Sequence, residues 1–132
     1  MATRRRVSPN DGRAALAEWE AGGRAPAVVA TAVRYTLEEL GARAPGGTVE
    51  VRVPPYGAVQ CVPGTQHTRG TPPNVVEADA DTWLRLATGA TAWDDATSGG
   101  AVSASGSRAS LAPWLPLFET ARGPSRDAAS EP

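Results

Sequence analysis

Hydrophobic residues recur every three or four positions between residues 26 and 43. The residues that show this spacing are Val29, Val33, Leu37 and Leu40. This spacing predicts a helix over residues 26–43 with one apolar face. Arg34 and Glu38 lie four residues apart on another face, where they are predicted to form an ion pair.

A shorter helix is predicted just before this one, over residues 9–21. Ser8 can cap its first turn, and Pro9 is well suited to the first helical position. The glycine pair at 22–23 should end it, because glycine readily leaves the helical conformation.

Strict alternation takes over in residues 48–53, where three valines alternate with charged residues. A period of two predicts a strand with one face toward solvent. Similar short apolar stretches predict strands at residues 58–62, 74–78 and 101–105. Residues 63–73 are rich in glycine and proline and show no period, so we expect a long loop there, either mobile or at a binding site.

Two short helices are predicted between the last two strands. Asp79 or Asp81 can cap the first, which should end at Gly89. Thr91, with Asp94 three residues on, resembles a capping box and predicts the start of the second. The two helices contribute large apolar side chains.

The last large hydrophobic residue of the chain is Phe118. A final helix is predicted over about 108–118, although Pro116 should kink or break it. The chain is long enough for one domain with one core, expected at residues 9–118. Residues 1–8 read as a flexible basic arm, and residues 119–132 as a disordered tail that is poor in apolar residues.

Composition narrows the classes of function. The net charge is −1, so the chain lacks the basic footprint of a nucleic-acid-binding protein outside the arginines at 4–6. All thirteen basic residues are arginine, which leaves no lysine for Schiff-base chemistry. No signal peptide or membrane span is evident, and the single Cys61 cannot form an intramolecular disulfide. We expect a cytoplasmic protein.

Candidate chemistry is sparse. Cys61 and His67 could be drawn as a nucleophile pair, but a cysteine that alternates with Val59 on a strand is typical of a small buried residue. One histidine and one cysteine cannot supply an ordinary zinc site. We therefore expect no catalytic residues, no metal and no cofactor. Arg69 could receive an anionic head group, or it could simply be solvated.

The acidic residues Glu77, Asp79 and Asp81 could suggest calcium. Without further spaced oxygen ligands they are better interpreted as capping and solvated residues.

The stretch from 74 to 111 resembles the C-terminal half of the sterol carrier protein 2 family. The residues that carry the resemblance are Asp79 and Asp81 before a helix, LATG at 86–89, the short helix TAWDDATSGG at 91–100 and the strand VSASG at 102–106. More narrowly, the chain is similar to bacterial sterol-carrier-like proteins from about residue 10 to residue 118. The resemblance implies an α+β fold, with a central antiparallel or mixed sheet of four or five strands and helices packed on one face.

The resemblance also implies a function. It points to non-enzymatic binding or transport of a fatty acid, acyl-CoA or sterol-like lipid in an apolar pocket between the sheet and the C-terminal helices, without association with nucleic acid or integral association with a membrane. The expected lining is Val33, Leu37, Trp83, Leu86, Trp93, Leu111, Trp114, Leu115 and Phe118. The alternative is a closed module of the same fold that docks on a partner enzyme. The residues alone do not separate pocket lining from plain core, and they do not identify the ligand, the partner or the oligomeric state.

Overall fold

The computed structural model describes residues 5–64 and 74–118. Residues 1–4 and 119–132 lie outside this part, and with them lie half of the expected arm and the whole of the expected tail. The expected loop residues His67 and Arg69 also lie outside it.

Two helices open the fold and pack on each other. α1 (Pro9–Glu20) begins where the sequence predicts, because the Ser8 hydroxyl accepts a hydrogen bond from the Asp11 N–H at 3.1 Å. α2 (Pro26–Arg43) has the predicted bounds. A Cβ placed on Gly12 would lie 2.1 Å from the nearest ring atom of Tyr35, so α1 approaches α2 through a position that only glycine can fill.

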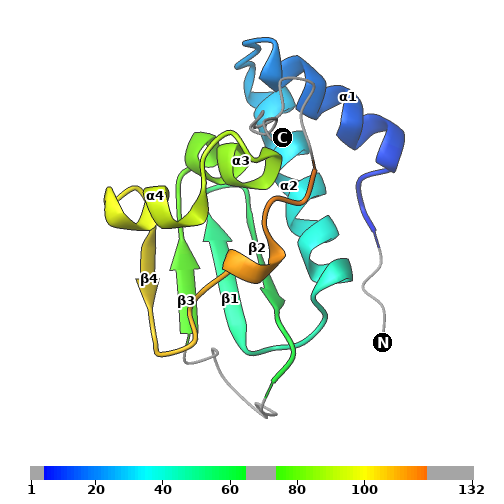
Figure 1. Cartoon of the computed structure of the whole chain (residues 1–132). Coiled ribbons are helices and arrows are strands. Elements are labelled where there is room, and N and C mark those ends of the chain that lie inside the picture. The colour runs from blue at the N-terminus through cyan, green and yellow to red at the C-terminus, as the bar shows by residue number, and fades with distance from the viewer. Residues whose placement is uncertain (1–4, 65–73, 119–132) are drawn as a thin grey trace, which may run out of the picture.

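Four strands form a mixed sheet in the described part of the chain. They are β1 (Val49–Val53), β2 (Gly57–Cys61), β3 (Asn74–Glu77) and β4 (Ser103–Ser105), in the order β2-β1-β3-β4. β1 pairs antiparallel with β2 and parallel with β3, and β4 returns antiparallel to β3 (Figure 1). The three valines of β1 are buried while the charged residues between them are partly exposed, which confirms the predicted one-sided strand.

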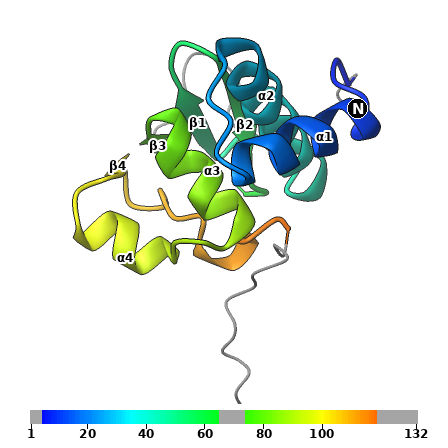
Figure 2. The same cartoon turned by 90° about the horizontal axis from the view of Figure 1, so that it is seen from above.

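The remaining elements are short. α3 (Ala80–Thr88) follows β3, α4 (Trp93–Ser98) follows α3, and one 3₁₀ turn, η1 (Ala112–Trp114), follows β4. Seen from above, α3 lies between the sheet on one side and α4 with η1 on the other (Figure 2). The predicted α+β fold with a mixed sheet of four or five strands is confirmed.

Both candidate caps of α3 have distinct roles. The Asp79 carboxylate accepts a hydrogen bond from the Thr82 N–H at 2.8 Å, which caps the helix. Asp81 instead accepts from the Trp19 indole N–H at 2.8 Å and pairs with Arg24 at 3.2 Å. The second acidic residue therefore fastens α3 to the end of α1.

Three local predictions are wrong. The final helix over 108–118 is replaced by η1 and extended chain, because Pro113 and Pro116 cannot donate the backbone hydrogen bonds of a continuous helix. The capping box at Thr91 is absent: the N-cap of α4 is Ala92, and no side chain caps it.

The predicted Arg34–Glu38 ion pair is also wrong. Arg34 donates to the carbonyl oxygen of Tyr56 at 3.2 Å. The Glu38 carboxylate instead accepts from the backbone N–H groups of Arg6 and Val7, at 3.1–3.2 Å. Tertiary partners have displaced the local pair.

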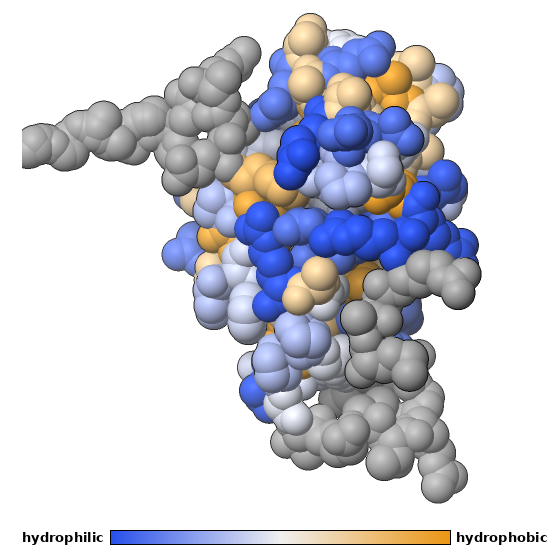
Figure 3. Space-filling model, turned by 90° about the vertical axis from the view of Figure 1, so that its right-hand side faces the viewer, coloured by the Kyte–Doolittle hydropathy of each residue, from blue (hydrophilic) through white to orange (hydrophobic). Residues whose placement is uncertain are grey.

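No helix within 5–64 or 74–118 combines the length and the apolar character needed to cross a bilayer. Figure 3 shows the side of the molecule on which α1 and α2 lie. Hydrophobic residues form separate patches there among hydrophilic ones.

Candidate functional site

A pocket of about 370 Å³ lies where the C-terminal end of α3, the start of α4 and the η1 segment meet. It is open to solvent and most of its wall is apolar. Its described lining residues are Leu86, Gly89, Thr91, Ala92, Trp93, Asp94, Ala112, Leu115 and Pro116. This size falls within the range of small-molecule sites in proteins, about 300–1,000 Å³.

Gly89 shapes the floor of the pocket. It ends α3 in the left-handed conformation, with φ +84°, as the sequence predicts. A Cβ at this position would lie 3.3 Å from Cβ and Cγ of Pro116, closer than most side chains approach. Glycine thus turns the chain toward α4 and also lets Pro116 come close to the end of α3.

The C-terminal wall, residues 112–118, is held by backbone hydrogen bonds to α3. The N–H groups of Leu117 and Phe118 both donate to the carbonyl oxygen of Ala87, at 2.8 and 3.0 Å. The Leu117 side chain is buried. These contacts fix the two residues just before them, Leu115 and Pro116, which face the pocket.

Side chains of α2 hold the same wall from the other side. Arg43 donates from Nη1 to the carbonyl oxygen of Leu117, and its guanidinium carbon lies 5.1 Å from the centre of the Phe118 ring. The Phe118 ring stacks on Tyr35 with 5.6 Å between the ring centres. The wall is therefore anchored to two helices.

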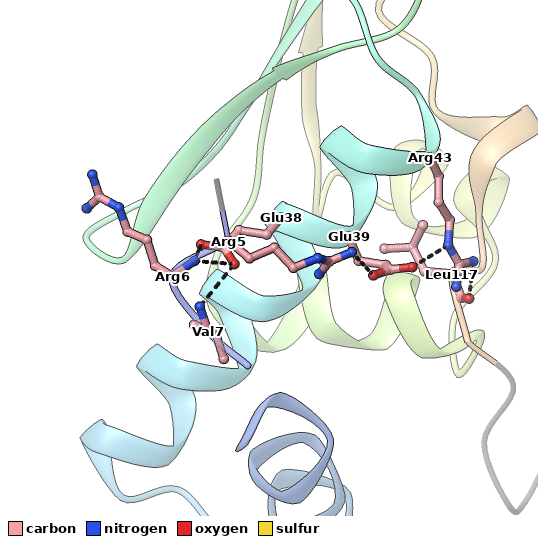
Figure 4. Close-up of polar contacts among 7 residues, drawn as sticks. All are labelled: Arg5, Arg6, Val7, Glu38, Glu39, Arg43 and Leu117. Atoms are coloured by element: carbon pink, nitrogen blue, oxygen red, sulfur yellow. Dashed lines mark hydrogen bonds and ion pairs between the residues drawn. The ribbon is translucent and has the colours of Figure 1, made fainter. Parts of the chain in front are cut away.

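Glu39 links the two ends of the described chain. Its carboxylate accepts from Arg5 at 2.7 Å and from Arg43 at 2.8 Å (Figure 4). Burial alone would raise the pKa of this carboxyl, but the hydrogen bonds and charges of the two arginines lower it below the ordinary value of 4.5. Arg5, Glu39 and Arg43 thus form a row along α2 that ends at the pocket wall.

The charge of the pocket is negative. Among its described lining residues, Asp94 alone carries a charge, and it is exposed. Thr91 is the other residue there with a polar side chain, while a tryptophan, two leucines, two alanines and a proline supply the apolar surface.

The structure divides the nine expected lining residues into three groups. Leu86, Trp93 and Leu115 line the pocket. Trp114 and Phe118 are partly buried against the core beside it. The other four are buried in the core, with 0–3% of their surface exposed: Val33, Leu37, Trp83 and Leu111.

This pocket is not the cavity that the sequence analysis expects. No strand residue is among its described lining, whereas the expected cavity lay between the sheet and the C-terminal helices. Large side chains of α3, such as Trp83 and Leu84, and Leu111 before η1 fill the space over the small residues of the sheet. The pocket therefore lies between α3, α4 and η1 and not directly on the sheet.

Sequence reasoning missed the turn residues of the pocket. These are Gly89, Thr91, Ala92, Asp94, Ala112 and Pro116. An apolar pattern selects large buried side chains, whereas a pocket mouth is made of small and polar residues in turns. The sequence feature that could have indicated these residues is the run of small residues directly after α3, which includes Gly89, Thr91 and Ala92.

The structure offers little for catalysis at Cys61. The thiol is fully buried at the end of β2, and burial raises its pKa from 9.0 to about 12, so no thiolate is available near neutral pH. In the described residues no group of three or more metal-ligating side chains comes together. Of the three acidic residues considered for calcium, Glu77 is exposed at the end of β3. Asp79 and Asp81 accept hydrogen bonds from Thr82 and Trp19.

A second, shallower hollow of about 460 Å³ lies between the arm, α1 and α2. It is lined by small residues together with the charged side chains of Arg6, Asp11 and Glu18. Its wall is more polar and more open than that of the first pocket. The pocket beside α3 and α4 is the better candidate for an apolar ligand.

Comparison with known proteins assigns the chain to a family. Residues 25–117 match the sequence model of a family described as bacterial SCP ortholog, and this range is more than half of the chain. It includes α2, the sheet, both short helices and nearly all of the C-terminal wall. A comparison with curated proteins finds no match. The chain belongs to the bacterial sterol-carrier-protein-like family.

Proposed function

We propose that this protein binds an apolar small molecule of lipid type in the pocket between α3, α4 and η1, and that it does so as a cytoplasmic carrier without catalysis. The observation that carries the proposal is the pocket itself, a hollow of about 370 Å³ with Leu86, Trp93 and Leu115 in its walls. Membership of a sterol-carrier-like family supports a carrier role.

The size of the pocket sets the expected affinity. Burying one methylene group contributes about 0.8 kcal/mol. A chain with about seven buried methylenes therefore gains at most about 5–6 kcal/mol before the entropic cost of association, so its dissociation constant should not fall below about 0.1 mM. The solvent-open mouth favours a ligand whose polar end stays in water.

The test uses 1-octanol, a neutral apolar probe, and the four indole N–H signals of the protein in two-dimensional NMR. The Trp93 signal, identified by its loss in Trp93→Phe, should move on titration and saturate. The signals of the buried Trp19 and Trp83 should stay in place. If octanol leaves Trp93 unchanged, the proposal fails.

A filled pocket supplies the matched control. Ala112 is exposed in η1 and lines the pocket, so Ala112→Phe places a ring in its mouth and should abolish the shift of Trp93. Ala104 is exposed in β4 and lies outside the lining, so Ala104→Phe should bind octanol as the natural chain does. Equal binding by both variants would show that octanol sits elsewhere.

The alternative function is that of a closed module that docks on an enzyme. The octanol titration distinguishes it from the binding role, because a closed module would not bind octanol. Docking sites usually need a contiguous apolar patch. The face that includes α1 and α2 shows scattered hydrophobic patches (Figure 3). Figure 3 shows one face only, so the support for the binding role comes from the pocket beside α3 and α4.

A further inference from the structure

We infer that the pocket selects ligands with a neutral or positively charged head group and discriminates against carboxylates. This inference rests on the proposed function and specifies the ligand class for the same site. A pocket that received a fatty acid anion would be expected to offer a cation at its mouth. Here the charge among the described lining residues is the carboxylate of Asp94.

The position of Asp94 gives it this influence. It is the second residue of α4, directly after Trp93, whose side chain supplies apolar wall. The ion pairs of the described residues involve Glu39, Asp81 and Glu50, so the Asp94 carboxylate has no arginine partner among them. No arginine is among the described lining residues either. The negative charge of Asp94 is therefore available to interact with the head group of a ligand.

The backbone of α4 does not reverse this sign. The free N–H groups of a first helical turn attract anions. However, α4 has six residues, and its first turn carries both Asp94 and Asp95, whose own charges outweigh that partial positive charge. A ligand carboxylate in the pocket would face Asp94, whereas Asp95 lies outside the described lining.

The solvent exposure of Asp94 limits how strongly it can discriminate between ligands of different charge. Asp94 is exposed, so water and salt weaken its field. At low ionic strength we expect an ammonium ligand to bind about three- to tenfold more tightly than a carboxylate of the same chain length, with the neutral alcohol between them. At high salt, where the screening length falls to a few ångströms, the differences should shrink.

The test compares octylamine, 1-octanol and octanoate on the natural chain at pH 7 and low ionic strength, following the Trp93 indole signal. Asp94→Asn should bring octylamine and octanoate within twofold of each other, with both affinities expressed relative to that of octanol for the same variant. Asp95→Asn removes the same charge one residue away, outside the described lining. It should preserve the order of affinities and is the matched control for general charge effects.

Each outcome decides a different point. Octanoate binding as tightly as octylamine to the natural chain would overturn the inference, while the proposed function would stand. The same holds if Asp94→Asn leaves the order unchanged, or if Asp95→Asn abolishes it equally. If none of the three probes moves the Trp93 signal, the proposed function fails and the inference falls with it.

Discussion

The indole N–H of Trp83 donates a hydrogen bond to the Thr36 hydroxyl across 2.7 Å, with both residues buried. The Thr36 hydroxyl in turn donates within α2, to the carbonyl oxygens of Ala32 or Val33 at 2.9 Å. This contact joins α3 to α2 in the middle of the core. It places the helix whose C-terminal end forms the pocket floor.

Thr36→Val should lower the free energy of unfolding by about 1–3 kcal/mol, because valine keeps the shape but leaves the indole N–H buried without an acceptor. Urea unfolding measures the change. Thr88→Val is the control: its hydroxyl is equally buried but bonds to carbonyl oxygens of its own helix. Equal losses in the two variants would contradict the importance of the indole contact.

Gly89→Ala should destabilise the protein more than Gly100→Ala. Both glycines have positive φ, +84° and +82°, so alanine costs about 1–2 kcal/mol at either position. At Gly89 the new Cβ also meets Pro116 at 3.3 Å, while at Gly100 nothing lies within 4 Å. The difference in urea midpoint between the two variants measures the crowding of the pocket wall, and equal midpoints would exclude it.

Glu39→Gln should destabilise the protein by about 0.5–1 kcal/mol at pH 7 and by less at pH 3. The pKa of Glu39 is lowered in the folded state, so its contribution is present above 4.5 and is lost as the pH falls through the lowered folded value. Urea unfolding at both pH values tests this, with the exposed Glu77→Gln as control. A loss that stays constant with pH would argue against the ion pairs with Arg5 and Arg43.

Cys61 should resist thiol reagents until the protein unfolds. Raising its pKa from 9.0 to about 12 lowers the thiolate fraction at neutral pH by about a thousandfold, and burial blocks access as well. The chain has a single cysteine, so labelling by a disulfide reagent in buffer and in urea gives an unambiguous rate ratio. Fast labelling of the folded protein would reopen the case for a nucleophile.

Much of the fold follows from local pattern. The apolar repeat of α2, the Ser8 cap of α1 and the alternation of β1 depend on neighbours in sequence, and all three are found as predicted. The parallel pairing of β1 with β3 and the strand order depend on long-range packing. A single sequence carries no comparable signal for them.

Local rules failed where distant residues compete. Arg34 and Glu38 have helical spacing, yet each finds a partner from another segment. The apolar residues after Leu111 look like a helix face, but two prolines make an extended wall whose N–H groups bond to Ala87. The pocket depends on that wall, so its position could not be read from periodicity.

The C-terminal wall emerges from the ribosome after the other elements that form the pocket. Leu115 and Pro116 close one side of the pocket, and they are synthesised after every other residue of its described lining. During translation, α3 therefore forms with Leu86 and Ala87 uncovered until this last segment is released. A nascent chain stalled before residue 112 should expose apolar surface to chaperones, and the pocket is complete only after the wall has docked.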